Sequence, residues 1–428
     1  MLRPAEPASR PDACTAHTTQ APVDRAALWS ICFALFAAAT SLSSLFVILP
    51  SVGRELGMTT TQVGLVIAPA GLLFVLAGPV WGRFGANLPR GPVLSVSLTA
   101  IGILTLLFGV VIDMRLAGRL PFLWCFGLMA ACRLLVAIFA ASILPTAQAH
   151  IAETSQGKAR TSALALMGAS FALGMVASPG VVAFTARWGI VVPFYVVAAS
   201  LLPAVVLLRR HVRTVGTPRR PATTGTLIMR TPLRLLWQPL AIIALLYTAY
   251  GTLQQVTGFR MQDQFGLGPQ DAATRAGTCL MAAAGGLVLT QLILSRTGVG
   301  RGRMWLLTIA CLTGLAGTAA LATDQRFAWQ LVAMAMFGVC VGVFMPIMLS
   351  LLTQRAEPVG DQARVGGWCG AAQGLGMVVG PMSGSASYQW HPVAPYVLAT
   401  TAVLAVCVLH ALSAAPRRHP RVPRARVP

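Results

Sequence analysis

Acidic residues, and charged residues in general, are scarce in this sequence. Only 10% of the 428 residues are charged, and 11 acidic residues stand against 32 basic ones, among which Lys158 is the single lysine. The nine cysteines show no paired spacing, so neither a disulfide framework nor a zinc site is expected. There is no nucleophile–base set and no glycine-rich phosphate loop, so the sequence predicts neither an enzyme nor a bound cofactor or metal.

Apolar residues and glycine are abundant instead. Hydrophobic residues make up 56% of the chain, the mean hydropathy is +0.73 and there are 41 glycines, a composition typical of polytopic membrane proteins. A membrane-spanning helix needs about 20 mostly apolar residues. Twelve such stretches are predicted, at 27–50, 62–83, 92–112, 121–146, 161–186, 192–208, 236–257, 275–295, 304–322, 328–352, 365–387 and 393–414.

One unusual helix occurs twice, with a register shift of 202 residues. GASFALGMVASPG begins at Gly168 and GAAQGLGMVVGPM begins at Gly370. A shift shared by long apolar segments indicates two copies of one module. Parallel repeats of spanning helices are typical of secondary transporters, whose substrate binds between the halves.

The sequence therefore predicts an all-α integral membrane fold of two six-helix pseudo-repeats. The expected segments are a polar N-terminal tail (1–26), a first bundle (27–208), a linker (209–235), a second bundle (236–414) and a basic C-terminal tail (415–428). The N-terminal tail does not have the short basic region of a signal peptide.

The basic residues predict the orientation of the chain. If the N-terminus is cytoplasmic, the cytoplasmic segments hold 24 of the 32 cations, the outer loops hold seven, and Arg133 lies inside a span. This satisfies the positive-inside rule with both termini cytoplasmic. The net charge of +21 then indicates contact with membrane lipid and not with nucleic acid.

Three motifs resemble those of a known family. The first, Gly78 to Leu94, resembles the loop-two signature of the major facilitator superfamily, GxxxD[RK]xGR[RK], with Gly82 and Arg90 in register. Ala86 replaces the family's aspartate, which helps latch the outward-closed state. The resemblance implies that Arg90 pairs with Glu153 at the inner end of the fourth span; the alternative is that Arg90 only sets orientation.

Arg133 carries the second motif, since CRLLVAIFAASILP resembles the family's helix-four pattern of an arginine followed by a small residue. A charge at the membrane centre costs ~2.5–3.5 kcal/mol on insertion scales, so such a residue normally faces a polar cavity. We therefore expect Arg133 to face the central cavity. The alternative is a structural role in holding helices together.

The repeated helix is the third motif and resembles the antiporter motif GxxxGPxxGG of exporters. Its residues here are Gly174 and Pro179 in the first copy and Gly376, Gly380 and Pro381 in the second. Small residues one turn apart allow close backbone contact, and proline bends the helix there. These helices are expected to form bent contacts between the halves; ordinary small-residue packing is the alternative.

Polar residues within the spans are the candidates for binding and coupling. Helix seven offers Tyr247, Gln254 and Gln255, and Ser41 and Gln373 lie in spans one and eleven. Each glutamine can bind substrate or tie helices together. Proton coupling ordinarily needs a buried carboxylate or histidine; Asp113, at the outer end of span three, is the best remaining acid, and a solvated rim charge is the alternative.

The resemblance implies a monomeric transporter of the bacterial inner membrane, in the drug/metabolite:proton antiporter branch. The expected function is export of a small organic molecule by alternating access with proton antiport. Residues 253–267, LQQVTGFRMQDQFGL, resemble siderophore exporters. The alternatives are an importer of a small carboxylate and a receptor that does not move solute.

Overall fold

The computed structural model describes residues 24–84, 88–155, 157–212, 233–297, 303–323, 326–356 and 362–414, and every regular element in these ranges is helical. The long helices are α1 (Arg25–Gly53), α2 (Thr60–Phe84), α3 (Arg90–Leu116), α4 (Phe122–Thr154), α5 (Gly157–Thr185), α6 (Val192–His211), α7 (Leu233–Phe265), α8 (Pro269–Thr297), α9 (Arg303–Thr323), α10 (Phe327–Ala356), α11 (Gln362–Trp390) and α12 (Ala394–Ala414), with a short 3₁₀ turn, η2 (Ala186–Trp188), after α5.

Local chemistry defines several helix ends. The Asp24 carboxylate caps α1 by accepting hydrogen bonds from the Ala26 and Ala27 amides at 3.0 and 3.4 Å. Between α1 and α2, and between α7 and α8, the chain turns through Gly57 and Gly266, whose φ angles of 83° and 60° favour glycine.

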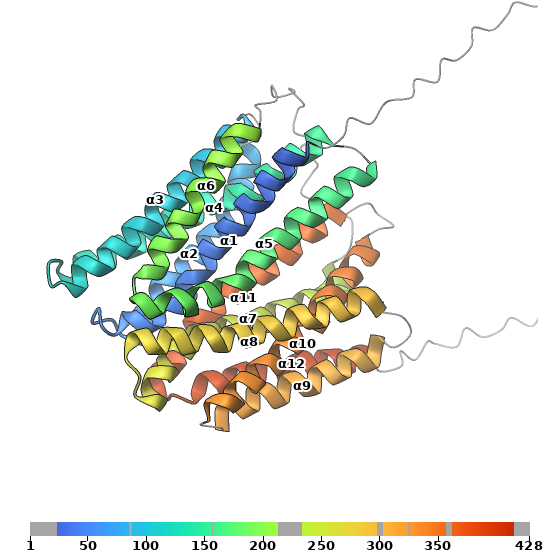
Figure 1. Cartoon of the computed structure of the whole chain (residues 1–428). Coiled ribbons are helices and arrows are strands. Elements are labelled where there is room, and N and C mark those ends of the chain that lie inside the picture. The colour runs from blue at the N-terminus through green and yellow to red at the C-terminus, as the bar shows by residue number, and fades with distance from the viewer. Residues whose placement is uncertain are drawn as a thin grey trace, which may run out of the picture.

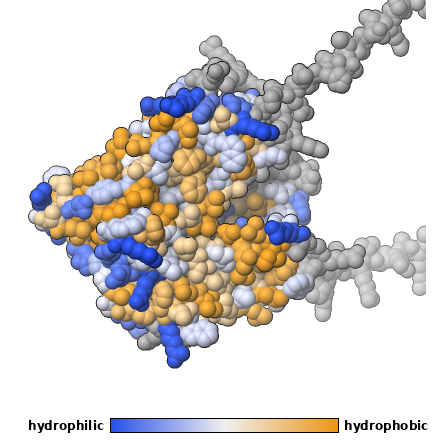
Figure 2. All heavy atoms as spheres, in the orientation of Figure 1, coloured by the Kyte–Doolittle hydropathy of each residue, from blue (hydrophilic) through white to orange (hydrophobic). Residues whose placement is uncertain are grey.

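The helices are built to cross a membrane. Eleven of them are long and apolar enough to span it; the twelfth, α11, is richer in glycine and serine. Figure 2 shows apolar side chains over much of the flank and hydrophilic ones mainly towards the ends of the bundle. Large apolar side chains are exposed on the helices, for example Trp124, Leu202 and Leu312. An apolar surface of this extent requires lipid around it.

Two halves repeat one packing pattern, which confirms the predicted pseudo-repeat (Figure 1). In the N-terminal half α1 packs on α5, α2 on α4 and α3 on α6. In the C-terminal half the equivalent pairs are α7 with α11, α8 with α10 and α9 with α12. Each half also contains a buried apolar cluster of its own.

The halves meet mainly at one end of the bundle. We call the end where α1 begins and α12 ends the termini side, and the opposite end the far side (Figure 1). Cross-half packing pairs α2 with α11, α5 with α8 and α1 with α7. The largest buried apolar cluster crosses the boundary near the far side and includes Ile48, Val63, Phe259 and Leu280.

Several helices extend beyond their predicted spans. Helix α7 continues to Phe265, whereas the apolar pattern ends at 257, and α4 continues to Thr154 instead of 146. Of the predicted linker (209–235), both ends are helical and residues 213–232 lie outside the described ranges, as do most of the N-terminal tail and all of the C-terminal tail. Hydropathy marks where a helix leaves the apolar layer and not where its hydrogen bonding ends.

Candidate functional site

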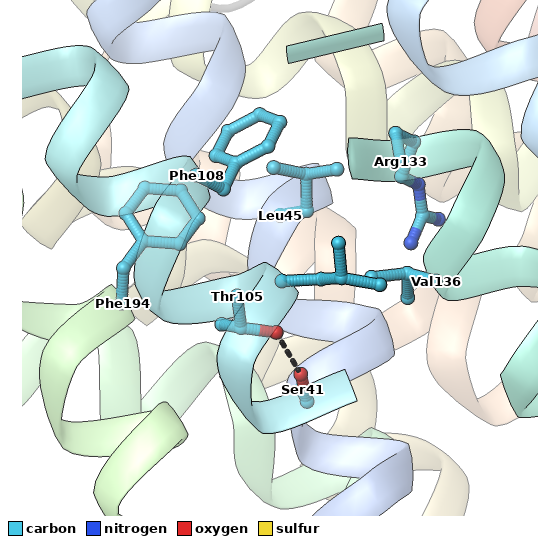
Figure 3. Close-up of a pocket in the computed structure, with 8 residues that line it drawn as sticks. Ser41, Leu45, Thr105, Phe108, Arg133, Val136 and Phe194 are labelled. Carbon is cyan, nitrogen blue, oxygen red and sulfur yellow. Dashed lines mark hydrogen bonds between the residues drawn. The ribbon is translucent and has the colours of Figure 1, made fainter. Parts of the chain in front are cut away.

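Arg133 lines a small cavity inside the N-terminal half. Side chains from α1, α3, α4 and α6 surround it, and Figure 3 shows Arg133 directed towards the others. The cavity measures about 20 Å³, which is room for one water molecule. Ser41 and Thr105 are joined there by a hydrogen bond of 3.0 Å between their hydroxyl oxygens. In this conformation Arg133 therefore faces the interior of its own half.

The Arg133 charge is poorly compensated. The residue is only 7% exposed, and its Nε has no hydrogen-bond partner among the described residues. The guanidinium lies over the Phe46 ring of α1, 5.5 Å from its centroid, a favourable contact when desolvated. A buried cation without an anion is costly, so this position is complementary to an anionic group.

Gln254 and Gln255 form a second buried polar group, on α7. They are 1% and 0% exposed, and both side-chain amide atoms of each lack a partner among the described residues. Gln254 lies one helical turn from Gly258, whose face contacts Pro50 of α1. Since α1 and α7 run in the same direction, this register brings Gln254 close to the depth of Phe46.

The other two predicted polar residues of the C-terminal half have local contacts. Tyr247 packs against Gly376 of α11 and stacks edge-on with Tyr250, with ring centroids 6.5 Å apart. Gln373 donates to the Cys369 sulfur at 3.5 Å. Both residues are only half-buried.

The repeated glycine helices pack inside their own halves, which corrects the expectation that these glycines join the halves. A methyl group added at Gly174 would lie 2.3 Å from the carbonyl oxygen of Phe36 on α1. One added at Gly380 would lie 2.5 Å from the carbonyl oxygen of Thr248 on α7, and Gly376 faces α7 as well. The small residues allow close packing within each half.

The carbonyl oxygens of the prolines in these helices, by contrast, face the other half, although the Pro381 ring packs against Gly251 of α7 in its own half. The Pro179 carbonyl oxygen would lie 2.6 Å from a methyl group added at Gly277 of α8. The Pro381 carbonyl oxygen would lie 3.3 Å from one added at Gly64 of α2. The repeat thus places a proline helix of each half against a bare glycine backbone of the other.

A polar cluster also joins the halves at the far side. Arg54, just after α1, forms a two-pronged ion pair with Asp263 of α7, in which Nη2 lies 2.8 Å from Oδ2. Asp263 also accepts a hydrogen bond of 2.7 Å from the Tyr388 hydroxyl of α11. These three residues are the far-side latch. The hydrogen bonds with Asp263 raise the pKa of Arg54.

Sequence reasoning missed this latch for a definite reason. The apolar pattern predicts that this span ends at 257, which places Asp263 in a loop, whereas Asp263 lies on the last helical turns of α7. Further hydrogen bonds across the halves are also on this side, from Gln262 to the Ser51 carbonyl (2.7 Å) and from Gln270 to the Arg187 carbonyl (2.7 Å). The latch is thus one of several polar contacts that hold the halves together on the far side.

Breaking the far-side latch is expected to shift the conformational balance with little effect on folding. The Arg54 and Asp263 side chains are partly exposed, so their ion pair stabilises the closed far side by about 0.2–1 kcal/mol. This corresponds to up to about a fivefold change in the open-to-closed ratio. Spin-label distances between positions 119 and 268 should lengthen in Arg54→Ala, at least as much in Asp263→Ala, which also loses the Tyr388 hydrogen bond, and no further in the double variant than in Asp263→Ala. Arg187→Ala, an exposed far-side arginine, is the control; additive effects of the two single changes would argue against coupling.

The comparison with known proteins assigns the family. The model of the Major Facilitator Superfamily matches residues 31–381. The chain belongs to the major facilitator superfamily. Multidrug resistance protein 1 of Bacillus subtilis (strain 168) is 24% identical over 379 residues, covering 86% of this chain and 90% of that protein.

Solved structures of this superfamily share the fold. A bacterial homolog of the human lysosomal transporter Spinster, in an inward-facing and unoccupied conformation, superposes with a TM-score of 0.65 at 15% identity and covers 91% of this chain and 95% of its own. The human organic anion transporter MFSD10 (TETRAN) gives 0.60 at 16% identity, covering 90% and 99%. At these identities the likeness concerns the fold alone.

The ion pair of the loop-two signature lies within the N-terminal half. Arg90 and Glu153 form the expected ion pair, with Nη2 3.0 Å from Oε1. It joins α3 to α4 of one half, so it does not itself hold the halves together. Ala86 and the surroundings of Gly82 lie outside the described residues.

Asp113, the acid considered for coupling, lies at the far-side end of α3. Its carboxylate accepts a hydrogen bond from the Tyr195 hydroxyl of α6, within the N-terminal half. Among the described residues, the carboxylate in an ion pair between the halves of this major facilitator protein is that of Asp263.

Proposed function

We propose that this protein exports a small organic molecule across the bacterial inner membrane by alternating access and proton antiport. The observation that carries the proposal is the distribution of contacts between the halves. Among the described residues, the ion pair and hydrogen bonds across the boundary lie on the far side. A conformation closed there is ready to take up solute from the termini side.

If the termini side is cytoplasmic, as the positive-inside rule predicts, this conformation takes up solute from the cytoplasm, which is the first step of export. The antiporter-like helix motif and the likeness to a protein named for multidrug resistance both support this direction. A reporter fused after Gly266 should be external, and one fused within 213–232 should be cytoplasmic. A cytoplasmic signal at Gly266 would contradict the orientation.

The proposed solute carries an anionic or metal-chelating group. Arg133 supplies an uncompensated positive charge, and Gln254 supplies unpaired amide donor and acceptor atoms from the other half. These groups come from α4 and α7, so a solute bound by both would couple the halves. The cavity at Arg133 has to widen for this, and alternating access provides such a movement. A siderophore-like metabolite and a drug-like compound both fit this chemistry.

The proposed proton antiport gives Asp263 the role first considered for Asp113. Protonation of the Asp263 carboxylate would remove the charge that holds Arg54, and the far side would open more readily. Asp113 and Asp263 can be compared directly, because each lies near the end of its helix and accepts a hydrogen bond from a tyrosine hydroxyl.

Probe accumulation in cells tests the proposed direction. Carboxyfluorescein, an anionic dye, and ethidium, a cationic dye, are measured in a deletion strain with and without the gene. Higher carboxyfluorescein accumulation in the deletion strain is the expected result, and an uncoupler should abolish the difference. Lower accumulation in the deletion strain would show uptake and contradict the proposed direction. A difference for ethidium alone would contradict the proposal that the solute is anionic.

A further inference from the structure

A second cavity lies at the termini side of the C-terminal half. It measures about 220 Å³ and its walls come from α7, α9, α10 and α12. None of these walls belongs to the N-terminal half, so the cavity is separate from the boundary between the halves. Its polar lining residues are Gln238, Arg355 and His410, and the other six are apolar.

The rim of this cavity lies at headgroup depth. Helix α10 has 30 residues and is about 45 Å long, whereas the hydrocarbon layer is about 30 Å thick. Arg355 is the last residue but one of α10, and Met304 is the second residue of α9. The cavity therefore opens where the helices leave the apolar layer.

The polar side chains are fixed by their neighbours. The Gln238 amide donates to the Leu409 carbonyl at 2.6 Å, and Arg355 donates to the Leu235 carbonyl. His410 is 6% exposed, and its Nε2 lies 3.2 Å from the Thr308 hydroxyl. The cavity thus has a positioned cation at its rim and a buried imidazole in its wall.

We propose that this cavity binds the phosphate headgroup of an anionic phospholipid from the leaflet on the termini side. The planar Arg355 guanidinium has five N–H donors and matches phosphate geometry. The apolar wall, which includes Leu307, Met348 and Leu351, suits the first methylenes of an acyl chain. Charge complementarity favours an anionic lipid, because anionic headgroups are attracted to basic segments next to the membrane.

Native mass spectrometry of the full-length protein in detergent tests this site. The protein is delipidated and mixed with phosphatidylglycerol or phosphatidylcholine of the same acyl chains. Phosphatidylglycerol adducts should exceed phosphatidylcholine adducts at least about threefold, and Arg355→Ala should weaken phosphatidylglycerol binding about tenfold. Arg296 is an exposed arginine at the termini-side end of α8, and Arg296→Ala should retain phosphatidylglycerol binding.

A filling variant separates the cavity from general surface charge. Leu351→Trp keeps every charge but occupies the cavity, so it too should lose phosphatidylglycerol, and it carries the test if Arg355→Ala fails to fold. Equal binding of the two lipids, or equal loss in Arg355→Ala and Arg296→Ala, would overturn the proposal. Displacement of the lipid by an equal concentration of glycerol phosphate would also overturn it, because the ligand would then be a soluble phosphate.

Discussion

Replacing Arg133 by alanine is expected to reduce carboxyfluorescein export to the level of a strain without the transporter. A hydrogen bond to a charged group contributes about 1.5–3 kcal/mol, which corresponds to about a 10- to 150-fold change in affinity. Arg133 is 7% exposed and its Nε has no partner among the described residues. Its removal therefore takes away an anion-binding group without breaking a hydrogen bond that holds the fold.

Four further measurements accompany this variant. The amount of protein in the membrane and its melting temperature should equal those of the wild type or exceed them, because an uncompensated buried charge is removed. Arg133→Lys should restore part of the export, since it keeps the charge but loses the planar fork. Arg119→Ala, at an exposed far-side position, is the control; unchanged export by Arg133→Ala would give Arg133 a structural or dispensable role.

Leucine at Gly277 and leucine at Gly376 are expected to fail in different ways. Gly277 of α8 lies against the Pro179 carbonyl of the other half, so a larger side chain should hold the far side open. Gly376 of α11 lies against α7 within its own half, so leucine there should force those two helices apart. Overpacking within one half, as at Gly376, reduces stability by about 1–3 kcal/mol and sometimes more.

The two variants are compared by melting temperature and by export. Gly277→Leu should retain the wild-type melting temperature, lose most export and lengthen the 119–268 spin-label distance. Gly376→Leu should lower the melting temperature and the amount of inserted protein. The same loss of stability in both variants would mean that Gly277 is needed for folding and not for the movement of the halves.

The helix count and the repeat were predictable because they depend on local sequence. Apolar stretches long enough to span a membrane define helices, and the shared register of Gly174 with Gly376 defines the two copies. Such a register says that both copies make the same contact but not with which helix. The glycines were therefore expected between the halves, although each packs on the first helix of its own half.

The polar contacts were predictable only where a motif pointed to them. The Arg90–Glu153 pair follows from the loop-two resemblance, and the structure contains it. The far-side latch brings together residues of α7 and α11 and the turn after α1, with Arg54 and Asp263 separated by 209 positions. No periodicity links such residues, and Asp263 lies beyond the apolar stretch by which α7 was recognised.

The exposure of the latch makes the resting conformation sensitive to the solution on the far side. Arg54 and Asp263 are 32% and 40% exposed, so dissolved ions reach both charges. Screening acts over about 8 Å at physiological ionic strength and about 3 Å at 1 M salt. Concentrated salt on the far side would thus weaken the attraction that closes this end, whereas salt on the termini side would not. The solution on the far side can in this way change the conformational balance of the transporter without touching its solute.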